Sequence, residues 1–492
     1  MISQSHSRCA SALLLVSTAV LAGGCATALG PGYTIEKQEI RVQFLPEPGP
    51  QIRIEADYRL RNTGNQPLDK LELRLPGRRR FHHENPNASW DSFALTARDS
   101  TENPRNSMIA LPEPWTTMSR HTLHLSVEYA PATAGETGLS FTKDAFFLPA
   151  QGWSPEFLPP PGLFANGGAP PKKWDLLVTV PDGFQIHTSG AQKKSARKGG
   201  ELVARAEQGP KDPYPFVAAG RYSAADIGKG KAKMHLWTSK PQESARLKDV
   251  SDALARVIAA YDDAFGERGN ESGQMWIVEC PVVPGCFTNL NPSTAKLLGE
   301  AETRRTTSEM ISQDTMVVDL SEGMPNLAAS VAPPLATTWL GYGQNPGFYE
   351  QEPPLSLLPA FAAATGREAA VGTDTRAGAI RRALQLIPEK SEPHKPESAE
   401  VTRAKSFLFF YALQDQYGRE VFRNAIRHML YSRQRRGFEL SDLIAAFEQE
   451  THTNVAEFVR KWMKRSGVPE EFRARYKETA AATVHAEKET IP

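Results

Sequence analysis

The chain of 492 residues is poor in cysteine, in charge of one sign and in the motifs of several enzyme classes. Only four cysteines occur, which excludes a small disulfide-dense scaffold. Lys and Arg number 57 against 56 for Asp and Glu, so the net charge of +1 does not indicate a nucleic-acid partner. No Gly-x-Ser-x-Gly elbow and no Gly-rich phosphate loop is present, so serine-hydrolase and nucleotide chemistry have no signature here.

The composition is that of a globular protein with more than one domain. Hydrophobic residues make up 40% of the chain and charged residues 23%, which does not fit a polytopic membrane protein. A chain of this length has room for two or three domains with cores of their own. The N-terminus departs from this composition.

The first 24 residues have the pattern of a signal peptide. A short polar segment contains Arg8, and an apolar core then runs from Ala12 to Ala22. This core is shorter than the about 20 apolar residues of a transmembrane helix, but it has the length of a signal-peptide core. We therefore predict that residues 1–24 direct export and are removed.

The end of this segment is similar to a bacterial lipobox. Small residues precede a cysteine in Leu21-Ala22-Gly23-Gly24-Cys25, although Leu21 lies one position further from Cys25 than in the commonest form. We predict lipidation of Cys25, with residues 25–32 linking the lipid to the folded body. Ordinary signal-peptidase cleavage nearby and an uncleaved anchor are the alternatives. Because Ala26 follows the cysteine, a Gram-negative host would place the protein on the periplasmic face of its outer membrane.

The two remaining cysteines suit an exported protein. Cys9 leaves with the signal peptide and Cys25 carries the lipid, so Cys280 and Cys286 form an even pair. Five residues separate them, which permits a disulfide that closes a tight loop in an oxidising compartment. Metal binding by this pair is the weaker interpretation, because no histidine or further cysteine is near in the sequence.

Residues 33–225 show the two-residue period of β-strands. Hydrophobic and polar side chains alternate in four segments, Gln51–Leu60, Lys70–Leu75, Leu123–Tyr129 and Trp174–Val180. The turn Asn62-Thr63-Gly64-Asn65 separates the first two segments. The pattern predicts an N-terminal antiparallel β-sandwich.

From about residue 235 the hydrophobic period becomes helical. An apolar stripe over Leu247–Tyr261 is followed by strand-like runs at 275–278 and 316–320, and helical spacing then continues to a segment that opens at Asn454. The predicted fold class is therefore α+β. After the sandwich, residues 235–476 form a domain with a small mixed sheet and a helical C-terminal half, and residues 477–492 form a polar tail.

One segment resembles the helix of a zinc peptidase without its ligands. Residues 331–341 read Val-Ala-Pro-Pro-Leu-Ala-Thr-Thr-Trp-Leu-Gly. A gluzincin aminopeptidase has His-Glu-x-x-His followed closely by Trp and Gly, with both imidazoles on one helical face where they can bind zinc. Two consecutive prolines predict that a helix over residues 326–341 is interrupted or restarted at Pro333-Pro334.

The order of the predicted elements resembles the aminopeptidase N (membrane alanyl aminopeptidase) family of gluzincins over residues 33–476. The best local matches lie at Trp153–Gly190, with Trp-Ser-Pro and Pro-Asp-Gly-Phe, and at Lys405–Pro469, with Phe-Glu-Leu-Ser-Asp-Leu and Phe-Val-Arg-Lys-Trp. The resemblance implies an aminopeptidase-like β domain at 33–225 and a degenerate, thermolysin-like gluzincin domain at 235–476.

The family's zinc-binding positions hold residues that cannot bind zinc. Pro333, Pro334 and Thr337 take the places of the His, Glu and His of the motif. The third ligand, a Glu in the family, corresponds to Ser356 by strict spacing or to Pro359 by the match of the surrounding motif. None of these side chains offers the neutral imidazole or the carboxylate that a zinc site requires.

Two further catalytic positions have also changed. Arg403 stands at the position of the family's transition-state Tyr, and the loop at 285–289 lacks the Glu that holds a substrate amine. Because all ligands are absent together, we expect no zinc, no other cofactor and no enzyme activity. The sequence favours a pseudoenzyme lipoprotein of the cell envelope that binds a peptide or a partner protein. The alternative is an exported, metallopeptidase-related hydrolase with an unorthodox or relocated active site.

Overall fold

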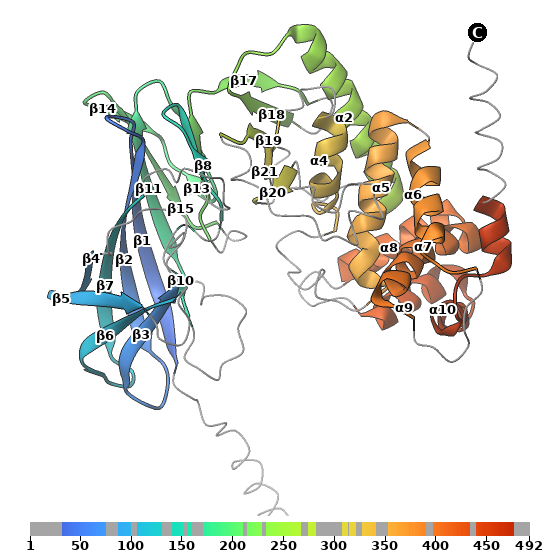
Figure 1. Ribbon diagram of the computed structural model, residues 1–492, viewed down its shortest axis with the longest axis horizontal. Helices are drawn as coiled ribbons and strands as arrows, with labels where there is room; N and C mark the ends of the chain where they lie inside the picture. Colours follow the sequence, from blue (N-terminus) through green and yellow to red (C-terminus); the bar gives the residue numbers. More distant parts are fainter. Residues whose placement is uncertain are drawn as a thin grey trace, which may run out of the picture.

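The computed structural model places a β-rich half beside a helical half (Figure 1). Within the described residues the chain forms three sheets and a series of helices, so the fold is mixed α+β, as predicted. The described residues are 32–74, 87–99, 106–129, 140–150, 153, 156–158, 171–209, 214–228, 233–266, 274–281, 308–312, 314–320, 327–340, 353–372, 374–389, 397–432 and 439–476.

A twelve-stranded sheet forms most of the β-rich half. Its strands are β1 (Tyr33–Leu45), β2 (Gln51–Asn62), β3 (Leu68–Arg74), β4 (Asn87–Trp90), β5 (Phe93–Asp99), β6 (Asn106–Trp115), β7 (Arg120–Tyr129), β10 (Glu156–Phe157), β11 (Trp174–Pro181), β13 (Ala191–Gln192), β14 (Ala196–Lys198) and β15 (Glu201–Glu207). They follow the order β10-β3-β6-β5-β4-β7-β2-β1-β11-β15-β13, and β14 pairs with β15. Burial alternates along β2 because successive side chains point to opposite faces of the sheet.

One pair in this sheet differs from the predicted arrangement. β1 and β11 are parallel, with Ile40 opposite Leu176 and Val42 opposite Val178, whereas the other pairs described in the sheet are antiparallel. The prediction of an antiparallel sandwich is therefore wrong at this position. Alternating hydrophobic residues specify which face of a strand is buried, but they do not specify the direction of its neighbour.

A four-stranded sheet covers the inner face of the large sheet. It has the order β12 (Gln185–Thr188), β16 (Val217–Gly220), β9 (Ala145–Leu148) and β8 (Ser140–Phe141). Phe44 of β1 stacks on Phe146 of β9 with ring centroids 5.0 Å apart. Residues of both sheets share one buried hydrophobic cluster, which makes this half of the protein a sandwich.

A five-stranded mixed sheet lies between the sandwich and the helices (Figure 1). Its order is β17 (Ser223–Asp226), β18 (Lys233–Thr238), β19 (Gln274–Glu279), β21 (Thr315–Val318) and β20 (Ser308–Met310). The β18–β19 and β19–β21 pairs are parallel, and the two outer pairs are antiparallel. The predicted small mixed sheet is thus confirmed.

The helical half packs against one face of the five-stranded sheet. Its elements are α2 (Ser244–Phe265), α4 (Leu327–Ala336), the 3₁₀ helix η3 (Leu355–Leu357), α5 (Leu358–Val371), α6 (Asp374–Gln385), α7 (Ala399–Tyr417), α8 (Arg419–Ser432), α9 (Leu440–Thr451) and α10 (Val455–Lys464). The predicted start of the last helix is confirmed, because the Asn454 side chain accepts a hydrogen bond from the backbone N–H of Glu457 at 3.0 Å.

The helices α2, α4 and α5 meet at a glycine. A Cβ atom at Gly366 of α5 would overlap the Tyr261 hydroxyl of α2 and would lie 3.0 Å from the Ala332 Cβ of α4. The Tyr261 hydroxyl in turn donates a hydrogen bond of 2.7 Å to the backbone carbonyl of Ala332. The three helices can therefore approach this closely only because position 366 has no side chain.

We expect Gly366→Ala to lower the free energy of unfolding by about 2 kcal/mol or more, because the added methyl group must separate three packed helices. Gly378→Ala in α6 is the matched control, since its Cβ would meet only the flexible end of Arg382 at 3.2 Å. That control should gain up to about 1 kcal/mol from better helix propensity. Urea unfolding monitored by circular dichroism measures both, and equal stability of the two variants would contradict the packing argument.

Candidate functional site

The helix α4 contains the residues that the sequence aligns with a zinc-binding motif. It runs without interruption from Leu327 to Ala336 and includes Pro333 and Pro334, so the prediction of a break at the two prolines is wrong. Proline lacks an N–H group and leaves carbonyls of the preceding turn without their usual helical donor. The Tyr261 hydroxyl of α2 donates a hydrogen bond to the carbonyl of Ala332 and so ties α4 to its neighbour beside the two prolines. Tertiary contacts thus support a helix that the local sequence disfavours.

Threonines end this helix one residue later. The hydroxyl of Thr337 donates to the carbonyl of Pro334 at 2.6 Å, and that of Thr338 donates to the carbonyl of Leu335 at 2.8 Å. Trp339 is anchored to α2, because its indole N–H donates to a carboxylate oxygen of Asp262 at 3.0 Å. The side chain at the second histidine position is therefore engaged in closing the helix.

The helix α5 packs against α4 and brings the other predicted positions near it, as expected for the helix that carries Phe361. Ser356 lies in η3 and Pro359 in the first turn of α5, and both are half-buried. Arg403 lies on α7, which contacts α5 and η3. Phe361 projects from α5 onto α7, where its ring centroid is 4.9 Å from that of Tyr411.

These residues do not fit a zinc ion. Pro333 and Pro334 offer no ligand atom in their side chains, and the Thr337 hydroxyl already donates to a backbone carbonyl. Within the part of the chain that the structure describes, no group of three His, Cys, Asp or Glu side chains could hold a metal ion. The loop at 285–289 lies outside the described residues.

The edge strand β20 lies beside α4. In the described residues β20 pairs with β21 alone, with Ser308 opposite Val318 and Met310 opposite Met316. The backbone N–H of Ile311 donates to the carbonyl of Thr315 at 2.9 Å, so Ile311 faces β21. Alternate residues of an antiparallel strand share one direction, so the backbone groups of Ser308 and Met310 face away from β21.

This order of sandwich, mixed sheet and helices occurs in solved structures of zinc peptidases. A mutant M1 zinc metallopeptidase of Deinococcus radiodurans bound to the substrate Tyr-Ser-Ala is similar to the chain with a TM-score of 0.51 and 15% identity, covering 89% of this chain and 96% of that one. A two-domain M1 zinc metallopeptidase mutant bound to L-arginine has a TM-score of 0.53 and 14% identity, covering 89% and 95% of the two chains. A third structure of such a mutant, bound to L-tryptophan, has a TM-score of 0.51 and 16% identity over 89% and 96%.

The chain has the fold of an M1 zinc metallopeptidase. No protein-family model matches the sequence. A search of curated proteins also found no match. At 14–16% identity the structural similarity shows the fold and leaves the activity open.

The M1 fold contradicts one conclusion drawn from the sequence. The expectation that the chain is not an enzyme is wrong, because the solved structures that share its fold are zinc metallopeptidases and point to an enzyme. The physical reason is that the lost ligands describe one place in the fold. The side chains at 333, 334 and 337 exclude zinc binding at these three positions. They do not establish that the whole protein is inactive.

Inside the M1 fold a buried histidine joins two sheets. His187 of β12 contacts the Oγ1 atom of Thr315 on β21 through its Nε2 atom at 2.8 Å. Thr315 donates its hydroxyl hydrogen to Asp314 at 2.9 Å, so His187 must be the donor in the first bond. The other ring nitrogen, Nδ1, then accepts from the side-chain amide of Gln192 at 3.3 Å. A neutral imidazole, protonated at Nε2, satisfies each of these hydrogen bonds.

The surroundings of His187 favour this neutral form. Its ring stacks on the indole of Trp276 with centroids 4.4 Å apart and also contacts Phe216 and Trp237. Burial lowers the pKa of His187 from 6.5 to about 4, the charge of Asp314 partly opposes this shift, and His235 adds to it. The imidazole is therefore neutral throughout the near-neutral pH range.

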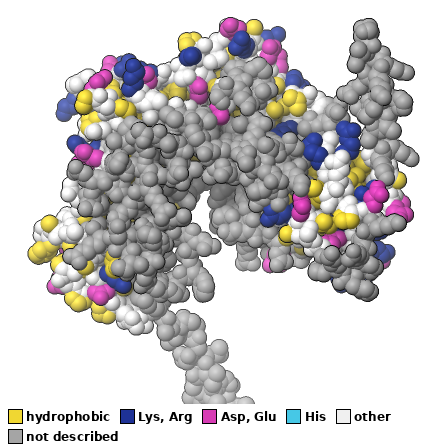
Figure 2. All heavy atoms as spheres, in the orientation of Figure 1, with side chains coloured by type: hydrophobic (Ala, Val, Ile, Leu, Met, Phe, Trp, Pro, Cys, Tyr) yellow, Lys and Arg dark blue, Asp and Glu magenta, His cyan; other side chains and the backbone are white. Residues whose placement is uncertain are grey.

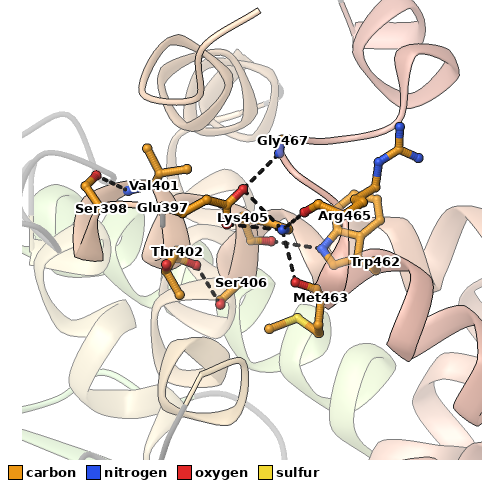
Figure 3. A network of polar contacts seen from close by, with 10 residues as sticks. All are labelled: Glu397, Ser398, Val401, Thr402, Lys405, Ser406, Trp462, Met463, Arg465 and Gly467. Atoms are coloured by element: carbon orange, nitrogen blue, oxygen red, sulfur yellow. Dashed lines mark hydrogen bonds and ion pairs between the residues drawn. The ribbon is translucent and has the colours of Figure 1, made fainter. Parts of the chain in front are cut away.

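A second buried network fixes the C-terminal helix (Figure 3). The amino group of Lys405, whose side chain is only 2% exposed, contacts the Glu397 carboxylate at 3.1 Å and the carbonyl of Met463 at 3.2 Å, and it also donates to the carbonyl of Arg465. The indole N–H of Trp462 donates back to the carbonyl of Lys405 at 3.2 Å. A lysine of α7 thus caps the last carbonyls of α10.

Sequence reasoning missed both networks, although each had a signal. Lys405 interrupts the apolar run that continues from Ser406 to Leu413, and an isolated charge in a buried stripe requires a partner. His187 follows a strand that was predicted as half-buried. The sequence does not show which residues they contact, because Thr315, the partner of His187, and Arg465, a partner of Lys405, are distant in the chain.

The predicted cysteine sites lie largely outside the described residues. Cys280 is disulfide-bonded and 5% exposed, at the end of β19 and in the cluster between the sheets. Cys25 and Cys286 are not among the described residues, so the lipidation and the 280–286 pairing stay predictions. Of the helices that the structure describes, none is long and apolar enough to cross a membrane.

The low pKa of His187 predicts a stability that depends on pH. The unfolded chain takes up a proton near pH 6.5, whereas the folded chain resists until about pH 4. The contribution of His187 to the free energy of unfolding is therefore fully present above pH 6.5. It is lost as the pH drops toward 4, by up to about 3 kcal/mol. His187→Gln should remove this component, measured as urea midpoints at pH 7 and pH 4.5.

Thr315→Val is the matched control for this prediction. It removes the hydrogen-bond partner but leaves the ring buried, so it should lower stability at pH 7 and keep the wild-type dependence on pH. If His187→Gln keeps the full wild-type dependence, His187 does not titrate as the structure predicts.

Proposed function

We propose that this protein is an exported, lipid-anchored, peptide-binding protein with the M1 peptidase fold. Export and anchoring rest on the apolar segment that precedes Cys25. Peptide binding rests on the edge strand β20, which lies beside α4 and carries backbone groups that face away from β21. This strand is the single observation that carries the proposal.

An edge strand binds a peptide by extending its sheet. An extended peptide beside β20 would exchange main-chain hydrogen bonds with Ser308, and the side chains of the peptide would alternate toward α4 and away from it. The replaced positions Pro333, Pro334 and Thr337 carry no charged side chain. Recognition then depends on shape and on main-chain bonds and not on a metal.

The ligands of similar proteins support a peptide as the occupant. The M1 structures with this fold contain the substrate Tyr-Ser-Ala, L-arginine or L-tryptophan. One of these ligands is a peptide and two are single amino acids, which supports a peptide or its amino-acid components as the class of ligand. Only the class of ligand is carried over from these structures to this chain, and no particular peptide sequence is implied.

The same similarity favours a second candidate, hydrolysis of peptides by a centre away from the replaced positions of α4. Such a centre would draw on residues other than Pro333, Pro334 and Thr337, because these cannot bind zinc or act as a base. Release of amino acids from tripeptides by purified protein, unchanged in Thr337→Val, would establish this candidate. Turnover that is lost in Thr337→Val would place the chemistry at α4 and contradict it.

The proposal predicts that Ser308→Pro weakens the binding of the tripeptide Tyr-Ser-Ala roughly tenfold, because proline removes one main-chain donor from the outer edge of β20. Ser308→Ala keeps this N–H and should bind like the wild type. Isothermal titration calorimetry measures the three affinities. Absence of tripeptide binding by the wild-type protein would overturn the proposed function.

The anchor makes a separate prediction. Mature protein from the native host should begin at Cys25 and partition into the detergent phase, and Cys25→Ser should release it or leave the signal peptide uncut. Mass spectrometry of the N-terminal peptide identifies the modification. A soluble mature chain with a different first residue would contradict the lipoprotein assignment and leave the peptide-binding proposal standing.

A further inference from the structure

One end of the twelve-stranded sheet exposes large hydrophobic side chains. Phe93 at the start of β5 is 62% exposed, and Met118 in the loop between β6 and β7 is 58% exposed. Among the described residues the other large exposed hydrophobics, Val371 and Tyr431, belong to the helical half. Figure 2 shows hydrophobic side chains at the outer edge of the β-rich half, where Figure 1 places β5. Single exposed hydrophobic side chains are normal, whereas those that gather at one place mark sites that bind another surface.

Strand pairing brings both side chains to one edge, which we call the rim. The backbone N–H of Met118 donates to the carbonyl of Asn62, the last residue of β2, at 2.9 Å. On the other side of β7, the N–H of Asp91 donates to the carbonyl of Thr122 at 2.7 Å, in the turn that leads to Phe93. The rim thus consists of 32, 62–64, 91–93 and 118–120, where β1, β2, β7 and β4 begin or end.

The chain enters the sheet at this same rim. The carbonyl of Gly32 accepts hydrogen bonds from the N–H groups of Thr63 at 2.9 Å and Gly64 at 2.8 Å. Only six residues lie between Cys25 and Gly32, and the seven steps from one to the other span at most about 25 Å in any conformation. A lipid on Cys25 therefore keeps the rim within about 25 Å of its bilayer. This step rests on the lipid anchor of the proposed function.

The rim is held rigidly and its charges are paired. The buried amide of Asn62 donates to the carbonyls of Gln66 at 3.0 Å and Trp115 at 2.9 Å, which fixes the two loops to each other. Arg120 forms an ion pair with Glu36 at 2.8 Å, and the imidazole of His121 contacts Asp91 at 2.7 Å. Paired charges offer little attraction to an acidic partner, so the exposed hydrophobic groups are the feature that a partner would use.

We propose that the rim docks on the bilayer that carries the lipid, with Phe93 and Met118 entering the interface between head groups and acyl chains. Aromatic and thioether side chains on short rigid loops suit this depth, because their apolar surface is buried while the backbone stays hydrated. The sheet would then stand on the membrane, and the mixed sheet with β20 would lie to its side (Figure 1). The anchor and the rim together would fix the orientation of the protein.

The experiment measures how deeply single probes enter the bilayer. The lipidated full-length protein carries an environment-sensitive fluorophore at Phe93→Cys or Met118→Cys, in vesicles of phosphatidylethanolamine and phosphatidylglycerol with brominated acyl chains. Glu47→Cys is the matched control, because this exposed residue lies in the turn between β1 and β2 at the opposite end of the same strands. We expect blue-shifted emission and quenching at 93 and 118 and neither effect at 47.

Each other outcome has a definite meaning. If the protein floats with the vesicles but the probes at 93 and 118 behave like the probe at 47, the anchor stands and membrane docking of the rim is overturned. If the protein does not float with the vesicles, the anchor and the docking proposal both fail. A blue shift without vesicles that grows with protein concentration would show that the rim binds a second copy of the chain, which also overturns the proposal.

A second measurement tests the energetic role of the two side chains. In the Cys25→Ser protein, which lacks the lipid, replacing both Phe93 and Met118 by serine should lower partitioning into the same vesicles roughly tenfold. Val371→Ser is the control, because that residue is equally exposed but lies at the end of α5. If Val371→Ser lowers partitioning equally, exposed hydrophobic side chains bind the vesicles wherever they lie, and the docking of the rim is overturned.

Discussion

Burial of both faces of the five-stranded sheet is the constraint on which the rest of the structure depends. Ile277 and Met316 face the helices, whereas Val278 and Val317, their neighbours along the chain, face the four-stranded sheet of the sandwich. A sheet covered on one side only would leave a row of apolar side chains in water. The two halves therefore need each other, and the bond from His187 to Thr315 crosses this boundary with its polar groups satisfied.

On the helical side the same demand for close packing determines how α4 is placed. The helices α2, α4 and α5 meet where Gly366 admits the Tyr261 hydroxyl and Ala332. A metal-binding helix must turn charged or imidazole side chains toward an open position. In this chain α4 instead carries two prolines and closes on Thr337, so its surface suits contact with uncharged groups. The edge strand β20 and the uncharged positions of α4 together lead to a peptide-binding proposal that uses no metal at α4.

The candidate site was partly predictable. The sequence predicted a helix over 326–341 and a helix carrying Phe361 packed opposite it, and the structure has both in α4 and α5. It did not show that α4 continues through Pro333 and Pro334, since the contacts that hold α4 in place, such as the bond from Tyr261 to Ala332, come from residues far away in the chain. The inference from lost ligands to lost activity failed for a related reason. The missing ligands concern one arrangement of catalytic residues, whereas the same fold can carry an active site made of other residues.

The sequence by itself determined the fold class, the alternation of buried and exposed residues along β2, and the cap at Asn454, because each depends on neighbours within a few residues. It also carries the linear pattern from which export and lipidation of Cys25 are predicted. Only the tertiary structure decided the parallel pairing of β1 with β11, the partners of Lys405 and His187, and the meeting of Phe93, Met118 and Gly32 at one rim. These contacts join residues that are distant in the chain, and local patterns carry no information on which distant segment lies alongside.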